Sequence, residues 1–297
     1  MAHNLLQIKN LKINFKTPYE NKGVVKAVSG IDLGISSGKT TGLVGESGSG
    51  KSVTALAVMG LLPKDRCEVS GEINYQGYNL LDLSNSELNI IRGKEISMIF
   101  QEPMTSLNPV LNIGKQIEEI LEKHLSLTNK QIKNKTLSLL EMVRIPDPES
   151  RIKNYPHQLS GGQRQRIMIA MALACTPKLL IADEATTALD VTIQLQILEL
   201  IRNLTESLGT ALLMITHNLG IIARYAHQVH VMKGGKIVEK GSAIEIYSSP
   251  NHNYTKELLK SVPRILSTTP KNKTINIIER NYDKETPLLS IRNLNVE

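Results

Sequence analysis

The sequence predicts an α/β protein with a largely parallel central sheet. Strand-like and helix-like segments alternate over residues 178–239, as expected of strand-helix-strand units. The first 60 residues are rich in strand-like segments and lead into a glycine-rich turn followed by a helix. Residues 111–145 are rich in Leu, Ile, Lys and Glu at helical spacing, which predicts a helical insertion into the sheet domain.

Alternating apolar residues define the strands before residue 100, most clearly over residues 6–15. The helix-like segment among them is rich in small and apolar residues and stops before Pro63. The expected strands of this part are residues 6–15, 24–28, 31–35, 41–44, 72–75 and 96–100, with a helix at residues 52–62.

In the second half, a short apolar run at residues 178–182 is typical of a strand buried on both faces. The other expected strands are residues 211–216, 228–232 and 236–239, the last two forming a hairpin. The expected helices are one after Ser160-Gly161-Gly162, then residues 191–207 and 219–225. Residues 262–287 are polar and resemble a linker.

Composition excludes several classes of protein. The chain has 297 residues, 41% of them hydrophobic, enough for a sizeable core. Its two cysteines, Cys67 and Cys175, form no CxxC pattern, which excludes a disulfide scaffold or a cysteine-built metal site. No apolar run approaches the ~18 residues of a membrane helix, and no secretory signal is visible, so we expect a cytoplasmic protein. The net charge of +7 is spread out and aromatic residues form no cluster, so no nucleic-acid partner is expected.

The most specific motif is a glycine-rich segment between an expected strand and an expected helix. Its pattern GxxxxGK[ST] is that of a phosphate loop, whose backbone N–H groups converge on phosphate oxygens at a helix N-terminus. Lys51 is expected to reach the β- and γ-phosphates, and the Ser52 hydroxyl to bind Mg²⁺. The motif reads Gly45-Glu46-Ser47-Gly48-Ser49-Gly50-Lys51-Ser52 and is called the phosphate loop below.

Two carboxylates end the apolar strand at residues 178–182. Asp183 and Glu184 lie where open α/β sheets bind their ligands, and on a strand their side chains point in opposite directions. We expect Asp183 to hold Mg²⁺ and Glu184 to polarise an attacking water molecule. A second anion site is predicted at the helix start Leu159-Ser160-Gly161-Gly162-Gln163. Because the chain already has a phosphate loop, this second site suits a nucleotide held by another domain.

These motifs, in this order and spacing, resemble those of the ATP-binding subunits of ABC transporters, over residues 5–265. The resemblance implies a P-loop ATPase domain over residues 1–265, with an antiparallel β subdomain and a helical subdomain at residues 103–160. It implies that Gln101 contacts Mg²⁺ and senses the transmembrane subunit. It also implies that Asp190, in Ala188-Leu189-Asp190, links two sites, and that His217 contacts the γ-phosphate and positions water.

The resemblance further implies the complete site. Phe15 most resembles the aromatic residue that stacks on adenine, with Tyr19 as the alternative. The expected catalytic residues are Lys51, Glu184 and His217, and the expected Mg²⁺ ligands are Ser52, Gln101 and Asp183. The expected nucleotide-binding residues are Phe15, Gly45, Glu46, Ser47, Gly48, Ser49, Gly50, Lys51, Ser52, Val53, Gln101, Ser160, Gly161, Gly162, Gln163 and Asp190.

Three further segments look like the dipeptide, oligopeptide and nickel importer group. They are Gln101-Glu102-Pro103-Met104-Thr105-Ser106-Leu107-Asn108-Pro109, Tyr155-Pro156-His157-Gln158-Leu159-Ser160, and Ser249-Pro250 with Tyr254-Thr255. The chain departs from this group in having Ala185 where the group usually has proline, and in lacking a cysteine-bearing tail. The departures weaken the assignment to the group and leave the expected catalysis intact.

A short repeat links the two ends of the chain. Residues 5–13 recur at residues 288–296 with five of nine positions identical. We therefore expect residues 266–287 to be a linker and residues 288–297 to begin a second, truncated ABC domain, as in importer ATPases that fuse two halves. The alternative is chance similarity between two short amphipathic segments.

The expected function is MgATP hydrolysis that powers an importer for peptides or similar small solutes. The expected partners are a second ABC ATPase domain, transmembrane permease subunits and, indirectly, an extracytoplasmic substrate-binding protein. The protein is expected at the inner face of the cell membrane. The alternatives are a soluble ABC ATPase acting on ribosomes or nucleic acid, and a regulatory half of a tandem ATPase.

Overall fold

The computed structural model describes residues 4–16, 23–100, 106–185 and 190–260. Its contacts divide the chain into a compact unit, Met1–Val262, and a second unit, Pro263–Glu297. The expected linker at residues 266–287 and the expected second domain at residues 288–297 lie outside the described residues and stay predictions. Among the described residues, none of the helices combines the length and apolar character needed to span a bilayer.

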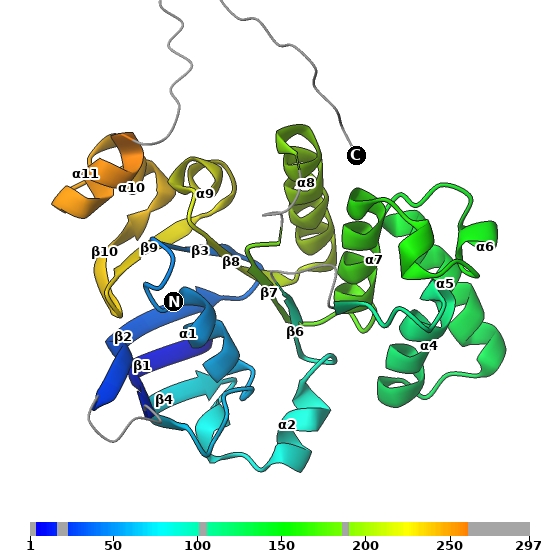
Figure 1. Ribbon diagram of the computed structural model, residues 1–297, viewed down its shortest axis with the longest axis horizontal. Helices are drawn as coiled ribbons and strands as arrows, with labels where there is room; N and C mark the ends of the chain where they lie inside the picture. The colour runs from blue at the N-terminus through cyan, green and yellow to red at the C-terminus, as the bar shows by residue number, and fades with distance from the viewer. Residues whose placement is uncertain (1–3, 17–22, 101–105, 186–189, 261–297) are drawn as a thin grey trace, which may run out of the picture. The chain divides into compact units, whose positions relative to one another are not determined.

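The centre of the first unit is a six-stranded sheet in the order β10-β9-β3-β8-β7-β6 (Figure 1). All neighbouring strands are parallel except the hairpin at one edge, which is formed by the last two strands. The strands are β3 (Thr40–Val44), β6 (Ile96–Ile99), β7 (Leu179–Asp183), β8 (Ala211–Thr216), β9 (Gln228–Lys233) and β10 (Lys236–Ser242). The predicted mainly parallel sheet is confirmed.

A smaller antiparallel sheet has the order β2-β1-β4-β5. Its strands are β1 (Asn4–Lys16), β2 (Val24–Ser36), β4 (Cys67–Tyr75) and β5 (Tyr78–Asn79). The prediction of separate strands at residues 24–28 and 31–35 was wrong, because they form the single strand β2. Gly30 is an extra residue opposite the Leu11–Lys12 step of β1, and this bulge lets the strand continue.

Helices cover both faces of the large sheet. The helices are α1 (Lys51–Val58), α2 (Asn85–Ile91), α4 (Ile113–His124), α5 (Asn129–Met142), α6 (Pro148–Arg151), α7 (Gly161–Leu173), α8 (Val191–Leu208), α9 (Leu219–Tyr225), α10 (Ala243–Ser248) and α11 (Asn253–Lys260). Single 3-10 turns lie at Leu80–Asp82 and Pro156–Gln158. The helix predicted over residues 52–62 is shorter than expected, because the chain turns at Met59 and Gly60.

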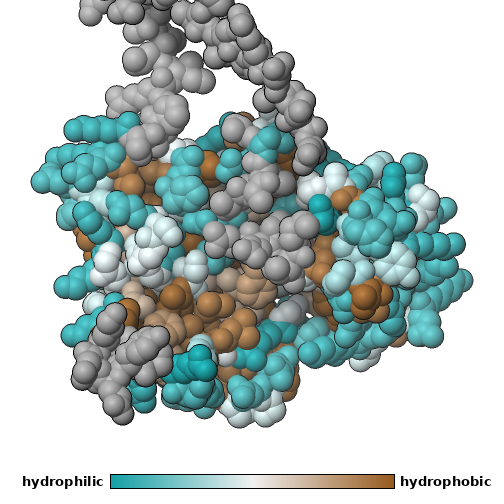
Figure 2. Space-filling view, in the orientation of Figure 1, coloured by the Kyte–Doolittle hydropathy of each residue, from teal (hydrophilic) through white to brown (hydrophobic). Residues whose placement is uncertain are grey.

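Two hydrophobic cores lie on the two faces of the large sheet. Along β7, Leu179 and Ile181 pack with α1 and the antiparallel sheet, while Leu180 and Ala182 pack with α4, α5, α7 and α8. A parallel strand buried on both faces is apolar at consecutive positions. Figure 2 shows mostly hydrophilic residues on the outward side of α4 and α5, as expected for helices that bury only one face.

Candidate functional site

The phosphate loop joins the carboxyl end of β3 to α1. Gly50 stands at the N-cap of α1 with a φ of 104°, a backbone conformation that residues with a Cβ rarely adopt. A Cβ at Gly50 would lie 2.5 Å from the carbonyl oxygen of Ala27, and a Cβ at Gly45 would overlap the carbonyl oxygen of Met232. The loop therefore runs so close to neighbouring backbone that these two positions accept only glycine.

Lys51 lies inside this loop and is only 4% exposed. Its Nζ donates hydrogen bonds to the carbonyl oxygens of Gly45 at 2.9 Å and Glu46 at 2.8 Å. Burial lowers the pKa of Lys51, while the negative charges of Glu184, Asp183 and Glu46 act in the opposite direction. The loop thus holds an ammonium group among carbonyl oxygens at the N-terminus of a helix, where anions are stabilised.

Ser52 and Asp183 meet although 131 residues separate them. The Ser52 hydroxyl donates to Oδ1 of Asp183 at 3.1 Å. Burial raises the pKa of Asp183; the hydrogen bond from Ser52 and the charge of Lys51 oppose this, and the charge of Glu184 adds to it. A hydroxyl and a carboxylate beside a phosphate loop are the hard oxygen ligands that Mg²⁺ prefers, so these residues fit a magnesium ion.

Glu184 follows the last residue of β7 and has a φ of 44°. The strand ends at Asp183, so the expected alternation of side chains along a strand does not apply to the Asp183–Glu184 pair. The backbone N–H of Glu184 donates to the carbonyl oxygen of Ile215 at 3.0 Å, which ties the turn to β8. A left-handed backbone at a non-glycine residue is strained and is typical of functional sites.

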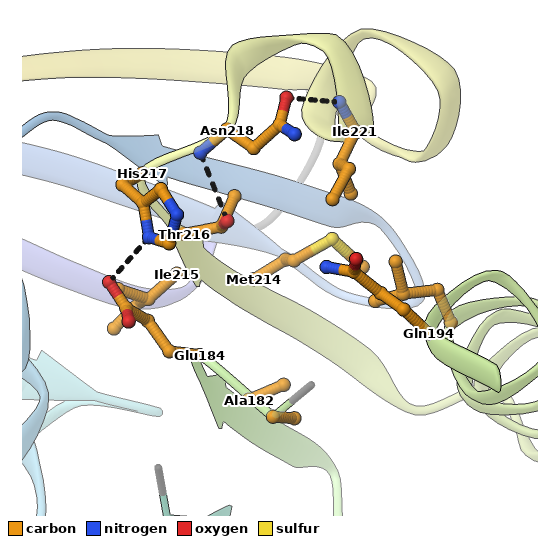
Figure 3. Close-up of a pocket in the computed structure, with 11 residues that line it drawn as sticks. Ala182, Glu184, Gln194, Met214, Ile215, Thr216, His217, Asn218 and Ile221 are labelled. Carbon is orange, nitrogen blue, oxygen red and sulfur yellow. Dashed lines mark hydrogen bonds and ion pairs between the residues drawn. The ribbon is translucent and has the colours of Figure 1, made fainter. Parts of the chain in front are cut away.

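His217 follows β8 and lies beside Glu184. Its Nδ1 is 3.2 Å from Oε1 of Glu184 (Figure 3). The next residue, Asn218, caps α9 by accepting hydrogen bonds from the N–H groups of Gly220 and Ile221. Glu184 and His217 line a cavity of about 160 Å³, and Gln194 of α8 lines the same cavity. The carboxylate and the imidazole are therefore placed together at the carboxyl ends of two neighbouring strands.

The other predicted residues lie on separate elements. Ser160 is the N-cap of α7, and its hydroxyl accepts from the N–H of Gln163 at 3.3 Å, with Gly161 and Gly162 in the first turn. Asp190 is the N-cap of α8 and accepts from the N–H of Ile193 at 3.0 Å. Phe15 is half-buried on β1 opposite Val25 and Cys67.

Gln101, Tyr19 and the pair Ala188-Leu189 lie outside the described residues, so the structure says nothing of their predicted roles. Val53, in the first turn of α1, packs against the core shared with the antiparallel sheet. For the site as a whole, the structure brings together the phosphate loop, Asp183, Glu184 and His217. Ser160 and Asp190 lie at the N-termini of α7 and α8, which pack on the face of the large sheet opposite to α1.

Sequence reasoning missed a tyrosine whose side chain touches the phosphate loop. The hydroxyl of Tyr254, at the start of α11, accepts a hydrogen bond from the N–H of Glu46 at 2.9 Å. Tyr254 belongs to a segment that resembles the importer group, and nothing in the sequence around it predicts a role. A contact across 208 residues leaves no local pattern, and the segment after Pro250 was not expected to form a helix.

Comparisons with known proteins identify the class of protein. The family model described as ABC transporter matches residues 28–187. The chain is 50% identical over 263 residues to a probable peptide ABC transporter ATP-binding protein, y4tR, of Sinorhizobium fredii, covering 88% of this chain and 78% of the relative. It is 51% identical over 265 residues to the oligopeptide transport ATP-binding protein OppD of Bacillus subtilis, covering 89% and 73%. The chain belongs to the ABC transporter family.

Solved structures agree with this assignment. One match is the dimeric ATP-binding cassette MJ0796 in a post-hydrolysis state bound to ADP and Pi. The match covers 80% of this chain and 98% of the MJ0796 chain, with a TM-score of 0.70 and 27% identity. The protein cbiO1 of Clostridium perfringens, part of the ABC transporter complex cbiONQ, matches 83% of this chain and 91% of its own, with a TM-score of 0.69 and 26% identity. The fold is that of a P-loop ATPase cassette, and the chain binds and hydrolyses ATP.

Proposed function

We propose that the chain is the MgATP-hydrolysing subunit of an importer for peptides or similar small solutes. The relatives named for peptide transport share about half of its residues over nearly nine-tenths of its length, as y4tR does with 50% over 88% of the chain. The observation that carries the catalytic part is the meeting of Lys51, Ser52 and Asp183 at the phosphate loop, with Glu184 directly after β7. These groups supply the cation, the metal ligands and the base that phosphoryl transfer to water needs.

In this proposal the phosphate loop and Lys51 bind the β- and γ-phosphates of ATP. Ser52, Asp183 and Gln101 hold Mg²⁺, which neutralises charge on the phosphate oxygens when bound. Lys51 is pre-positioned, because two carbonyl oxygens of the loop already fix its ammonium group. A fixed cation in a water-poor site stabilises charge that develops on the γ-phosphoryl group without reorganising.

Glu184 is proposed to accept a proton from the attacking water. His217 contacts the Glu184 carboxylate, and its ring is more than half exposed, which leaves it access to the γ-phosphate. The two side chains follow β7 and β8, which are neighbours in the sheet, so the sheet sets the distance between them. Phe15 is proposed to stack on the adenine.

The partners are a second ABC ATPase domain and permease subunits, at the cytoplasmic face of the membrane. Ser160, Gly161, Gly162 and Gln163 of this chain contact the nucleotide that is bound to the second domain. Asp190 links the two nucleotide sites.

A groove of about 310 Å³ supports a permease contact. It is lined by Phe100 and Ser106, the residues that flank residues 101–105, where Gln101 is predicted to sense the permease. Buried Met168 lies in this groove with exposed Lys123, a combination that suits an amphipathic helix.

The test uses Glu184→Gln and a matched control, Glu141→Gln, which changes an exposed carboxylate on α5. The variants are assayed for MgATP hydrolysis, and for uptake of a labelled oligopeptide in Bacillus subtilis cells in which the chain replaces OppD. Wild type and Glu141→Gln are expected to hydrolyse ATP and restore uptake. Glu184→Gln is expected to bind ATP but lose hydrolysis by about a hundredfold or more, and uptake with it. Hydrolysis without peptide uptake contradicts the import proposal, and unimpaired hydrolysis by Glu184→Gln contradicts the role of Glu184.

A further inference from the structure

The C-terminal helix α11 touches the phosphate loop through one tyrosine. The N–H of Glu46 donates to the hydroxyl of Tyr254 at 2.9 Å. Tyr254 is 2% exposed, whereas Glu46 is exposed, so the hydrogen bond between them is partly buried. The ammonium of Lys233 lies over the face of the ring, with its Nζ 4.4 Å from the ring centroid.

The segment before α11 is anchored to the large sheet. The N–H groups of Asn251 and His252 donate to the carboxylate of Glu239 on β10, at 2.7 and 3.1 Å. His252 in turn accepts a hydrogen bond at Nδ1 from the N–H of Tyr254 at 3.2 Å. The tyrosine therefore reaches the loop from a fixed base.

The peptide that Tyr254 contacts is the one that holds Lys51. The N–H of Glu46 and the carbonyl group of Gly45 belong to the same peptide unit. Its carbonyl oxygen accepts from Nζ of Lys51 at 2.9 Å, and its N–H donates to Tyr254 at 2.9 Å. A peptide unit is planar, so fixing the direction of its N–H also fixes the direction of its carbonyl. Tyr254 thus sets the orientation of a group that holds the ammonium of Lys51.

We propose that Tyr254 is a positioning residue of the ATP site, acting through the Gly45–Glu46 peptide to aim Lys51 at the phosphates of ATP. The inference rests on the role proposed above for Lys51. It assigns α11 a part in nucleotide binding, beside the motifs that contact the nucleotide themselves. Gly235, in the turn between β9 and β10, supports the loop from another side, since its N–H donates to the carbonyl of Ser49 at 3.0 Å.

The test is a double-mutant cycle of Tyr254→Phe and Lys51→Met in the full chain. Tyr254→Phe removes the hydroxyl and keeps the ring under Lys233. The matched control is Tyr225→Phe on α9, a buried tyrosine that also has a cation, Arg224, over its ring. The Kd for MgATP and the melting temperature are measured for each variant, with binding measured well below the lowest melting temperature.

Tyr254→Phe is expected to raise the Kd for MgATP about three- to tenfold, the usual worth of one hydrogen bond. Tyr225→Phe is expected to leave it unchanged. In the Lys51→Met background, Tyr254→Phe is expected to have no further effect, because the two residues act in series. A merely structural tyrosine would lower the melting temperature and change the Kd equally in both backgrounds, which overturns the inference, as does an unchanged Kd in the wild-type background. If Lys51→Met alone leaves ATP binding intact, the proposed role of Lys51 fails instead.

Discussion

Asp183 illustrates how opposing effects act on the pKa of a buried carboxyl group. Its carboxylate is 4% exposed and accepts a hydrogen bond from Ser52. Burial raises its pKa, whereas the hydroxyl of Ser52 and the ammonium of Lys51 favour the charged form. A divalent cation at this position favours the charged form further, because opposite charges attract strongly where water is excluded.

Asp183→Asn is therefore expected to weaken the response to Mg²⁺. It keeps the shape of the side chain and removes the negative charge that attracts the ion. We expect the Mg²⁺ concentration for half-maximal ATP hydrolysis to rise about tenfold or more, in line with the loss of a ligand charge. The measurement is a Mg²⁺ titration of hydrolysis, with Asp65→Asn as the control because Asp65 is exposed and 75% of its side chain is accessible. An identical titration for Asp183→Asn and wild type contradicts the assignment.

Glu184 shows what the sequence could not reveal at this scale. The motif placed the two carboxylates at a strand end, and the contact of Asp183 with Ser52 agrees with that placement. The φ of 44° at Glu184 has no signature in the sequence, because no glycine marks it. Such a conformation costs about 1–3 kcal/mol and is imposed by neighbouring structure, here the hydrogen bond to Ile215 of β8.

At the scale of elements, two missed helices did carry a signal. Ser84 and Glu87 form a capping box at the start of α2, and Ser242 and Glu245 form another at the start of α10. The pattern of serine followed three residues later by glutamate is a recognised helix start. Both helices are short, with seven and six residues, so apolar periodicity alone could not reveal them.

Two buried threonines on helices α5 and α8 differ in whether their hydroxyl groups are hydrogen-bonded. Thr136 on α5 is fully buried and its hydroxyl has no hydrogen-bond partner. Thr205 on α8 is 2% exposed and its hydroxyl donates to the carbonyl of Ile201 at 2.9 Å. A buried polar group without a partner destabilises the folded state, whereas a satisfied one contributes to it.

Thr136→Val is thus expected to stabilise the fold by about 1 kcal/mol, and Thr205→Val to destabilise it by about the same amount. Valine matches threonine in shape, so neither change alters packing volume. The check is the melting temperature, expected to rise by a few degrees in the first variant and to fall by a few degrees in the second. A fall for both variants would mean that the Thr136 hydroxyl finds a partner in solution.

At the scale of the whole molecule, the two predicted anion-binding helix starts belong to opposite cores. The phosphate loop opens α1, which packs with the antiparallel sheet, and Ser160 opens α7, which packs with α4 and α8. The order of motifs along the chain predicted that both are present, and the sheet topology separates them. Contacts between distant segments, such as that of Tyr254 with Glu46, could not be predicted from the sequence. They depend on where the hairpin β9–β10 positions α11.

The proposed pairing with a second ABC ATPase domain can be tested with a chain that binds ATP but does not hydrolyse it. Glu184→Gln removes the proposed base and keeps the loop that binds ATP, so a closed pair should accumulate when hydrolysis stalls. We expect the solution mass of Glu184→Gln to double when MgATP is added, and to stay monomeric with MgADP. The double variant Glu184→Gln with Lys51→Met is the control, because it lacks the buried ammonium that is proposed to bind phosphate. A monomeric mass with ATP demonstrably bound contradicts self-pairing and means that the exposed start of α7 serves the nucleotide of a different ATPase domain.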